Sequence, residues 1–383
     1  MVTWRSSKKS FAVEYSKTKS IASSIIASSL IFVSLTGCIW KQSSNEYVEA
    51  QSIEQIQVPS AAVEWYNRGY ALGESGKYTE AIASYDQAIE IKPDYHLAWY
   101  GRGWALDELG KYNEAIASYD QAIKFKPDNS FAWNNRGWAL YNLEKYQEAI
   151  ASYDKAIEIK PDYAYPWNNR GVALYYLGKY QEAIASYDQA IKFKPDYHDA
   201  WYGRGISLYE LGKYKKAIAS FDQVIKFKPD YHDAWTSRGL TLDELGKYTE
   251  AIASFDQAIE IKLDDHLAWN NRGNSLNELG KYTEAIASYD RAIKIKPDYH
   301  EAWNNRGFAL YNLKRYQEAI ASYDRAIEFK PDFDYAWTNR GVALYYLGKY
   351  QEAIASYDRA LEIEPDFHSA IFNRRLALKK LDR

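Results

Sequence analysis

The sequence has very little of several features that define other protein classes. Its 383 residues include one cysteine and one methionine, and 48 basic side chains almost balance 51 acidic ones. A single cysteine excludes an internal disulfide framework, and a structural zinc site needs several closely spaced Cys or His residues. The net charge of −3 argues against a protein that coats nucleic acid phosphates. The sequence therefore predicts no nucleic acid partner.

No apolar run is long enough for a typical membrane-spanning helix. The most apolar segment, Ile21 to Leu35, carries no charge but is shorter than the roughly 20 residues that span a bilayer. It follows a segment, residues 1–20, with five basic side chains and one acidic one. A basic segment followed by a short apolar one is typical of a secretory leader.

The apolar segment ends in Leu35, Thr36, Gly37 and Cys38. This ending resembles the bacterial lipobox, which implies that a signal peptidase removes residues 1–37 and that the Cys38 thiol is acylated. The sequence thus predicts a lipid-anchored protein on the extracytoplasmic side of a membrane in the bacterial cell envelope. The alternative is an incidental cysteine after an ordinary signal peptide. Loss of the leader would raise the net negative charge, since most of its charges are basic.

Aromatic residues are abundant, with 36 Tyr and 13 Trp. Nine of the tryptophans recur at one constant spacing from Trp65 to Trp337, without insertion or deletion, which indicates a repeat protein. The polar segment 38–61 before them reads as the acylated cysteine and a flexible tether. The nine repeats are 62–95, 96–129, 130–163, 164–197, 198–231, 232–265, 266–299, 300–333 and 334–367.

Each repeat predicts two helices. In the first repeat, apolar residues recur at offsets of three and four before and after Gly76, which is the spacing of one helix face. Gly76 is suited to end the first helix, and Pro93 follows the end of the second. Trp at repeat position 4, Gly at 8, Ala at 20, an aromatic residue at 24, Ala at 27 and Pro at 32 together resemble the tetratricopeptide repeat. Glu144 and Lys314 depart from the pattern at the turn glycine, and Leu263 at the proline.

This resemblance implies an all-α, right-handed superhelical solenoid whose first helices line a concave groove for an extended peptide or a partner helix. The last residues, 368–383, begin like a tenth repeat and predict a polar capping helix. A longer period is also visible, because residues 171–188 recur unchanged at 341–358. We infer that a block of five repeats was duplicated. Whether the two halves each bind a ligand is a hypothesis.

Two sets of side chains are candidates for the groove. A helical wheel points repeat positions 6, 12 and 13 of the first helix away from the core. Primary amides both donate and accept hydrogen bonds, so a ladder of asparagines at position 6 suits a peptide backbone and resembles the ladder of O-linked N-acetylglucosamine transferases. The alternative is that these asparagines are soluble surface filler. The ladder is Asn67, Asn135, Asn169, Asn271, Asn305 and Asn339.

Tyrosines at positions 12 and 13 form the second set, in two clusters that occupy equivalent places in the two halves of the duplication. Exposed tyrosine favours interfaces, although packing between neighbouring helices is an equally good interpretation. Acidic residues between the clusters predict negative potential in the middle of the groove, or simply a solvated face. The tyrosines are Tyr141, Tyr175 and Tyr176, then Tyr311, Tyr345 and Tyr346; the acidic residues are Asp199, Glu210, Asp233, Asp243, Glu244 and Glu278.

Other recurring polar residues predict structure rather than chemistry. The arginine at position 7, such as Arg68, flanks the core and is expected to meet a carboxylate, for which the aspartate that recurs in each second helix is a candidate. All six histidines occupy position 1 and are held apart in separate repeats, so no metal site is expected.

The sequence predicts neither an enzyme nor a cofactor. The serine that recurs in every second helix is a repeated scaffold position without a neighbouring base, and the repeats leave little chain for a catalytic domain. The expected function is a non-catalytic, membrane-anchored adaptor that binds partner proteins or extended peptides. The alternative is a glycan or cell-wall binding module that uses the Asn and Tyr side chains.

Overall fold

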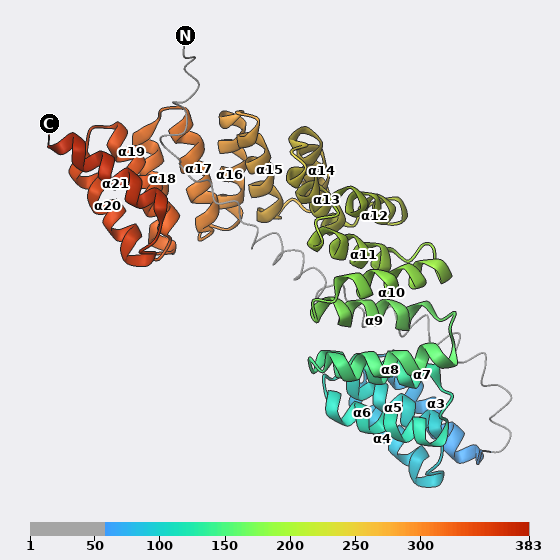
Figure 1. The fold of residues 1–383 in the computed structure, drawn as a ribbon. Coiled ribbons are helices and arrows are strands. Elements are labelled where there is room, and N and C mark those ends of the chain that lie inside the picture. The colour runs from blue at the N-terminus through green and yellow to red at the C-terminus, as the bar shows by residue number, and fades with distance from the viewer. Residues whose placement is uncertain (1–57, 383) are drawn as a thin grey trace. The chain divides into compact units, whose positions relative to one another are not determined.

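The computed structural model of the protein describes residues 58–382. The predicted leader 1–37, the lipobox Leu35, Thr36 and Gly37, the anchor Cys38 and nearly all of the tether lie outside these residues. Within the described range all regular structure is helical, and the helices follow one another in antiparallel pairs (Figure 1). This confirms the predicted all-α architecture of nine helix pairs plus a final helix.

Nine first helices and nine second helices alternate along the described chain, and one helix follows them. The first helices are α3 (Ser60–Glu74), α5 (His96–Glu108), α7 (Ser130–Asn142), α9 (Ala164–Tyr176), α11 (His198–Glu210), α13 (His232–Glu244), α15 (His266–Glu278), α17 (His300–Asn312) and α19 (Asp334–Tyr346). The second helices are α4 (Tyr78–Ile91), α6 (Tyr112–Phe125), α8 (Tyr146–Ile159), α10 (Tyr180–Phe193), α12 (Tyr214–Phe227), α14 (Tyr248–Ile261), α16 (Tyr282–Ile295), α18 (Tyr316–Phe329) and α20 (Tyr350–Ile363). The final helix is α21 (His368–Leu381).

The described residues form two compact blocks, which we call the N-block (58–228, α3–α12) and the C-block (229–382, α13–α21). In each block a helix packs against its pair mate and against the following helix (Figure 1). The boundary lies close to residue 232, where the sixth repeat begins. The two blocks therefore correspond to the two halves of the duplicated sequence.

The turn between paired helices needs a left-handed backbone. Seven repeats place glycine there, with φ between +68° and +78°. Glu144 and Lys314 adopt the same conformation, with φ of 60° and 61°. A side chain makes this conformation costly, so these two turns carry local strain that the packing of the helices offsets.

Close packing of each pair depends on small residues. A Cβ atom added to Gly171 would lie 2.7 Å from the fully buried ring of Tyr187. The repeat tryptophans are only half-buried, however. The indole Nε1 of Trp201 donates to the carbonyl oxygen of Pro195 at 2.9 Å, so this ring covers the turn that leads into its own repeat. The same bond recurs in the neighbouring repeats.

The final helix α21 packs on α20 as a first helix would, and Arg374 forms an ion pair with Asp358. The exposed surface of α21 is less polar than expected for the predicted polar capping helix. Phe372 is 47% exposed and Leu378 is 37% exposed, whereas Leu344, the equivalent of Leu378 in the preceding repeat, is buried. The difference arises because no described second helix follows α21. No helix between residues 58 and 382 is both long and apolar enough to cross a membrane.

Candidate functional site

The recurring arginines join successive repeats. In the N-block, Arg204 Nε donates to Asp188 Oδ1 at 2.6 Å, and its Nη1 donates to Ser220 Oγ at 2.7 Å. Asp188 belongs to the preceding repeat and Ser220 to the same repeat, so each arginine links two second helices. The predicted meeting of arginine with aspartate is confirmed, and the recurring serine is its second acceptor. The same contacts recur at Arg102, Arg136, Arg170, Arg272, Arg306 and Arg340.

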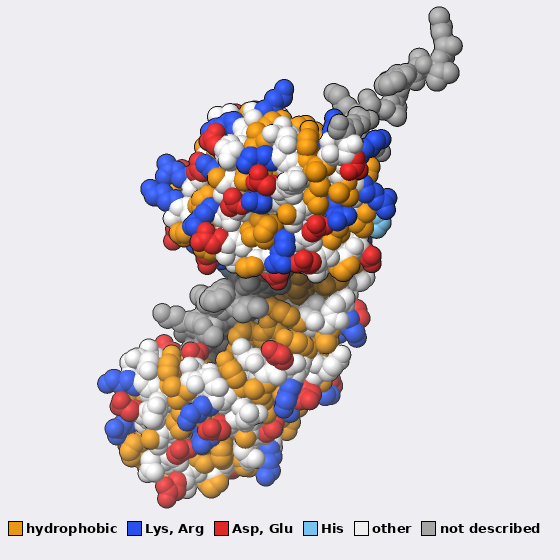
Figure 2. Space-filling model, turned by 90° about the vertical axis from the view of Figure 1, so that its left-hand side faces the viewer, with side chains coloured by type: hydrophobic (Ala, Val, Ile, Leu, Met, Phe, Trp, Pro, Cys, Tyr) orange, Lys and Arg blue, Asp and Glu red, His pale blue; other side chains and the backbone are white. Residues whose placement is uncertain are grey.

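Lysine–glutamate ion pairs also place opposite charges side by side on the surface. Lys247 lies 2.8 Å from Glu250, and Lys349 lies 3.1 Å from Glu352, both at the starts of second helices. On the face shown in Figure 2, basic and acidic side chains are interspersed rather than gathered into large areas of one sign. Recognition by a broad field of one charge is therefore not favoured on this face.

The predicted asparagine ladder is not open to a ligand along its length. Asn169, Asn271, Asn305 and Asn339 are 2–6% exposed, whereas Asn67 is exposed and Asn135 is half-buried. The prediction that this ladder lines an accessible groove is therefore wrong for the four buried members. Three of these amides, those of Asn169, Asn305 and Asn339, donate to the preceding repeat, as in the 3.1 Å bond from Asn169 Nδ2 to Asn134 Oδ1. The Asn271 side chain instead accepts from Asn270 in its own repeat. The helical wheel missed this burial because it describes one helix and not the next helix stacked against it.

The same bond pattern recurs in the C-block. Asn305 Nδ2 donates to Asn270 Oδ1 at 3.2 Å, and Asn339 Nδ2 donates to Asn304 Oδ1 at 3.1 Å. Burial of a primary amide is costly unless it is hydrogen-bonded, so these contacts help to fix the register of successive first helices. Asn67 and Asn135 are the members whose exposure still permits contact with a ligand.

The predicted tyrosines belong to two larger aromatic clusters. The N-cluster comprises Tyr141, Tyr146, Tyr175, Tyr176 and Tyr180, at the C-terminal ends of α7 and α9 and the starts of α8 and α10. The C-cluster comprises the equivalent Tyr311, Tyr316, Tyr345, Tyr346 and Tyr350 of the C-block.

Sequence reasoning missed the members that begin the second helices. Tyrosine begins the second helix in every repeat, so its recurrence does not distinguish these members from the tyrosines outside the clusters. In the N-cluster, Tyr146 stacks on Tyr176 with ring centroids 5.4 Å apart and planes 11° apart. Trp138 extends this cluster by stacking on Tyr141 at 5.4 Å. The clusters thus combine packing between neighbouring helices with partial exposure, and contact of these tyrosines with a ligand stays a prediction.

Histidines and acidic residues meet at the starts of some first helices. His198 Nδ1 lies 3.0 Å from Asp199 Oδ1, and His232 Nε2 lies 3.3 Å from Asp233 Oδ1. Burial raises the pKa of Asp233, although His232 acts in the opposite direction. Asp199 and Glu210 lie in the N-block, and the other four predicted acidic residues lie in the C-block. Between residues 58 and 382, no three His, Cys, Asp or Glu side chains form a group suited to a metal ion.

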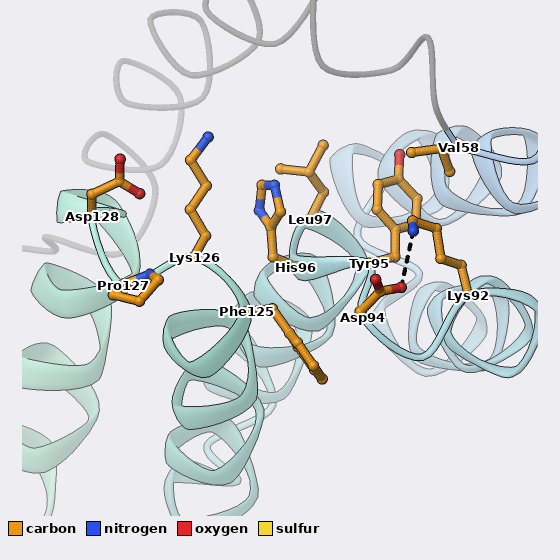
Figure 3. Close-up of a pocket in the computed structure, with 10 residues that line it drawn as sticks. All are labelled: Val58, Lys92, Asp94, Tyr95, His96, Leu97, Phe125, Lys126, Pro127 and Asp128. Atoms are coloured by element: carbon orange, nitrogen blue, oxygen red, sulfur yellow. Dashed lines mark ion pairs between the residues drawn. The ribbon is translucent and has the colours of Figure 1, made fainter.

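A cavity of about 410 Å³ lies in the N-block. Sequence reasoning did not identify this cavity. Apolar side chains line it together with both charge signs, and Lys92 pairs with Asp94 at 3.0 Å (Figure 3). Burial raises the pKa of Tyr95 on its wall to about 12, so this phenol is neutral at physiological pH. Its lining residues are Val58, Lys92, Asp94, Tyr95, His96, Leu97, Phe125, Lys126, Pro127 and Asp128.

Repeated helix pairs joined by internal ion pairs and hydrogen bonds define a helical repeat protein of the scaffold class. Family models identify the repeat. One model described as tetratricopeptide repeat matches residues 66–130, 168–232 and 206–266. A second model with the same description matches residues 130–163, 300–333 and 335–367. A third, described as TPR repeat, matches residues 273–314. The chain belongs to the tetratricopeptide repeat (TPR) family. Membership in this family supports a function as a protein–protein interaction scaffold.

Several solved structures are similar. YrrB, described as a TPR protein with an unusual peptide-binding site, is 21% identical over 49% of this chain and 97% of its own, with a TM-score of 0.43. MamA is 27% identical over 42% of this chain and 94% of its own, with a TM-score of 0.40. The APC/C hetero-tetramer Cut9–Hcn1 is 16% identical over 84% of this chain and 78% of the matched chain, with a TM-score of 0.49. No curated protein matches the chain.

Proposed function

We propose that this protein is a non-catalytic scaffold, anchored through a lipid on Cys38 to the extracytoplasmic side of a bacterial membrane. Its repeats bind partner proteins or extended peptides through side chains of the first helices. TPR membership supports the scaffold class. The basic leader, the apolar segment and the ending at Cys38 support the anchor.

One observation carries the proposal: polar positions that recur in every repeat are used differently from positions that vary between repeats. The arginine, aspartate and serine that recur in the repeats bond to one another, as Arg170 does with Asp154 and Ser186. Positions that differ between repeats include half-buried aromatic side chains, such as Trp138 and Tyr141. Recognition through variable residues on a uniform framework is the usual property of a repeat scaffold.

Changing Cys38 tests the anchor. The variant Cys38→Ser should leave the protein unacylated, because serine has no thiol. It should move from the membrane fraction to the soluble extracytoplasmic fraction and lose incorporation of labelled fatty acid. The matched control is Ser34→Ala, which removes a hydroxyl near the predicted cleavage site but keeps the cysteine. Membrane retention of Cys38→Ser would contradict the anchor.

Binding measurements test the scaffold. The Cys38→Ser chain should bind members of a peptide array or crosslink to a limited set of envelope proteins, and the amount bound should saturate as the concentration rises. Binding to a glycan array alone would contradict a protein scaffold and favour the alternative cell-wall binding module.

A further inference from the structure

The helix α21 exposes a face that a second helix covers in the preceding repeat. It packs on α19 and α20 as a first helix would (Figure 1). In α19, Leu344 at repeat position 11 is 1% exposed and belongs to one apolar cluster with side chains of α20. The equivalent Leu378 of α21 is 37% exposed, because no described helix follows α21 to cover it. We call Ile371, Arg375 and Leu378, at positions 4, 8 and 11, the open face.

Arg375 stands where each of the nine repeats has glycine. In those repeats, a Cβ atom added to the glycine would lie 2.5–2.8 Å from the aromatic ring at position 24 of the second helix. Gly341 of α19, for example, lies against the ring of Tyr357, which is fully buried. An arginine at position 8 therefore excludes a second helix that carries its aromatic ring at the same depth. A helix that covers the open face must meet Arg375 with a different side chain.

The charged residues on the exposed surface of α21 are basic. The helix contains no acidic residue. Arg374 is used in the ion pair with α20, but Arg375, Lys379 and Lys380 are exposed and form no ion pair within residues 58–382. A second copy of α21 would bring like charges together, whereas an acidic surface would complement them. The charge of α21 thus favours an acidic partner over self-association.

We propose that the open face binds an acidic amphipathic helix of a partner protein. Its apolar stripe packs on Ile371 and Leu378, and one of its carboxylates pairs with the Arg375 guanidinium. Arginine suits this role, because its planar group donates two parallel hydrogen bonds to a carboxylate. Docking of an amphipathic helix on an apolar surface is a common mode of peptide recognition. This inference rests on the proposed scaffold function and names the chemistry of one partner.

A helix fits the open face better than a bilayer surface does. Arg375 lies four residues after Ile371 and three before Leu378, so the three side chains follow one stripe of α21. A partner helix can place a carboxylate opposite the guanidinium and apolar side chains on both sides of it. Helices that lie in a bilayer surface instead separate their charged and apolar residues onto opposite faces. The cation in the middle of this stripe therefore favours a protein partner.

The chain itself supplies a probe for this face. Because α20 packs on α19, a peptide of residues 350–363 can be offered to α21 as a second helix. A covalent bridge between positions 351 and 355, both exposed in α20, keeps the isolated peptide helical. Three versions of the peptide are compared: unmodified, Tyr357→Glu and Tyr357→Gln. Fluorescence anisotropy of the labelled peptides measures their binding to the full chain carrying Cys38→Ser.

The Tyr357→Glu peptide should bind most tightly. The Tyr357→Gln peptide should bind at least tenfold more weakly because it lacks the carboxylate, and so should the unmodified peptide, because its ring clashes with Arg375. The variant Arg375→Gly should reverse the order, so that the unmodified peptide binds more tightly than Tyr357→Glu. Arg325→Gly is the matched control, since Arg325 is an exposed arginine of α18 outside the open face, and it should keep the original order. Circular dichroism should show that both variants are folded.

Three results would overturn the proposal. The first is no binding of the Tyr357→Glu peptide at millimolar concentration, and the second is an unchanged order of affinities in Arg375→Gly. The third is another occupant, seen as self-association in sedimentation, or as binding to phosphatidylglycerol vesicles, that Leu378→Ser abolishes.

Crosslinking separates this inference from the proposed function. If envelope proteins crosslink to the chain while the Tyr357→Glu peptide does not bind, the scaffold function stands and this inference fails. If the peptides bind with the expected reversal but no protein crosslinks, this inference stands and the proposed function fails.

Discussion

One stretch of sequence occurs in both blocks but differs in exposure between them. Residues 171–188 and 341–358 are identical, yet Tyr175 is 7% exposed and Tyr345 is half-buried. The neighbouring Tyr176 is half-buried, whereas Tyr346 is 42% exposed. Among the described residues, the first copy is followed by α11 and α12, whereas the second is followed by α21 alone. Burial in a solenoid thus depends on the next repeat as well as on the local sequence.

Removing the two equivalent tyrosines should sharpen this comparison. Tyr175→Ala should destabilise α9 and its neighbours by about 3 kcal/mol, because it leaves a cavity where a buried ring packed. Tyr345→Ala should cost about 1 kcal/mol, since its ring is already in contact with water. Native-state hydrogen exchange of the amides in α9 and α19 measures both effects in the full chain. Equal losses at the two sites would show that exposure does not decide the cost.

A second pair of equivalent residues differs in chemistry. In the N-block, Tyr119 donates to Asp107 Oδ2 at 3.2 Å. In the C-block the residue equivalent to Asp107 is Asn277, whose Nδ2 donates to the Tyr289 hydroxyl at 2.6 Å. Burial raises the pKa of Asp107 well above its usual range, although the Tyr119 hydrogen bond acts in the opposite direction. The ionised carboxylate is therefore less favourable in the folded protein than in the unfolded chain.

The variant Asp107→Asn should stabilise the N-block by about 2 kcal/mol at neutral pH, because it removes a poorly solvated charge and keeps an acceptor for Tyr119. Because the folded-state pKa is raised, the carboxyl does not destabilise the fold below its unfolded pKa of about 4. The free energy of unfolding then falls as the pH rises toward the folded-state pKa. Urea unfolding at several pH values checks this. The gain should shrink toward acid pH, and a gain independent of pH would refute the electrostatic explanation.

The two turns without glycine offer the smallest test. Glu144→Gly and Lys314→Gly should each stabilise the chain by roughly 0.5–1 kcal/mol, because glycine adopts positive φ without steric cost. Thermal unfolding measures the change, and Gly178→Ala is the reciprocal control that should destabilise a glycine turn. Since these turns occupy equivalent places in the two blocks, the two gains should be similar. A clear difference would mean that the blocks constrain this turn unequally.

Much of the framework was predictable because it depends on contacts that recur with the period. The constant spacing of the tryptophans indicated the repeats, the apolar offsets around Gly76 indicated the helix pairs, and the flanking position of the repeat arginine predicted its bond to a carboxylate. These features recur in many copies, so each one is observed several times in a single sequence. The serine as second acceptor of Arg204 was not predicted, because nothing in the spacing distinguishes it from other small residues of the second helix.

The candidate site was less predictable. The sequence predicted an accessible asparagine ladder, but Asn169, Asn305 and Asn339 are buried and donate to the preceding repeat. It identified Tyr141 and Tyr176 but omitted Tyr146, whose ring lies against Tyr176. The cavity beside Tyr95 combines side chains from the turns of successive repeats. All three depend on contacts across repeats, which a wheel drawn for one helix does not include.

The sequence by itself determined the period, the helix pairs, the duplication and the residues that repeat. Local signals suffice for these features, because each repeat forms its helices from its own apolar spacing and its own turn residue. Only the tertiary structure decided which amides are buried, which tyrosines join a cluster and which identical side chains differ in exposure. The physical reason is that burial is a property of neighbouring surfaces. Two copies of one sequence therefore acquire different surfaces when different helices pack beside them.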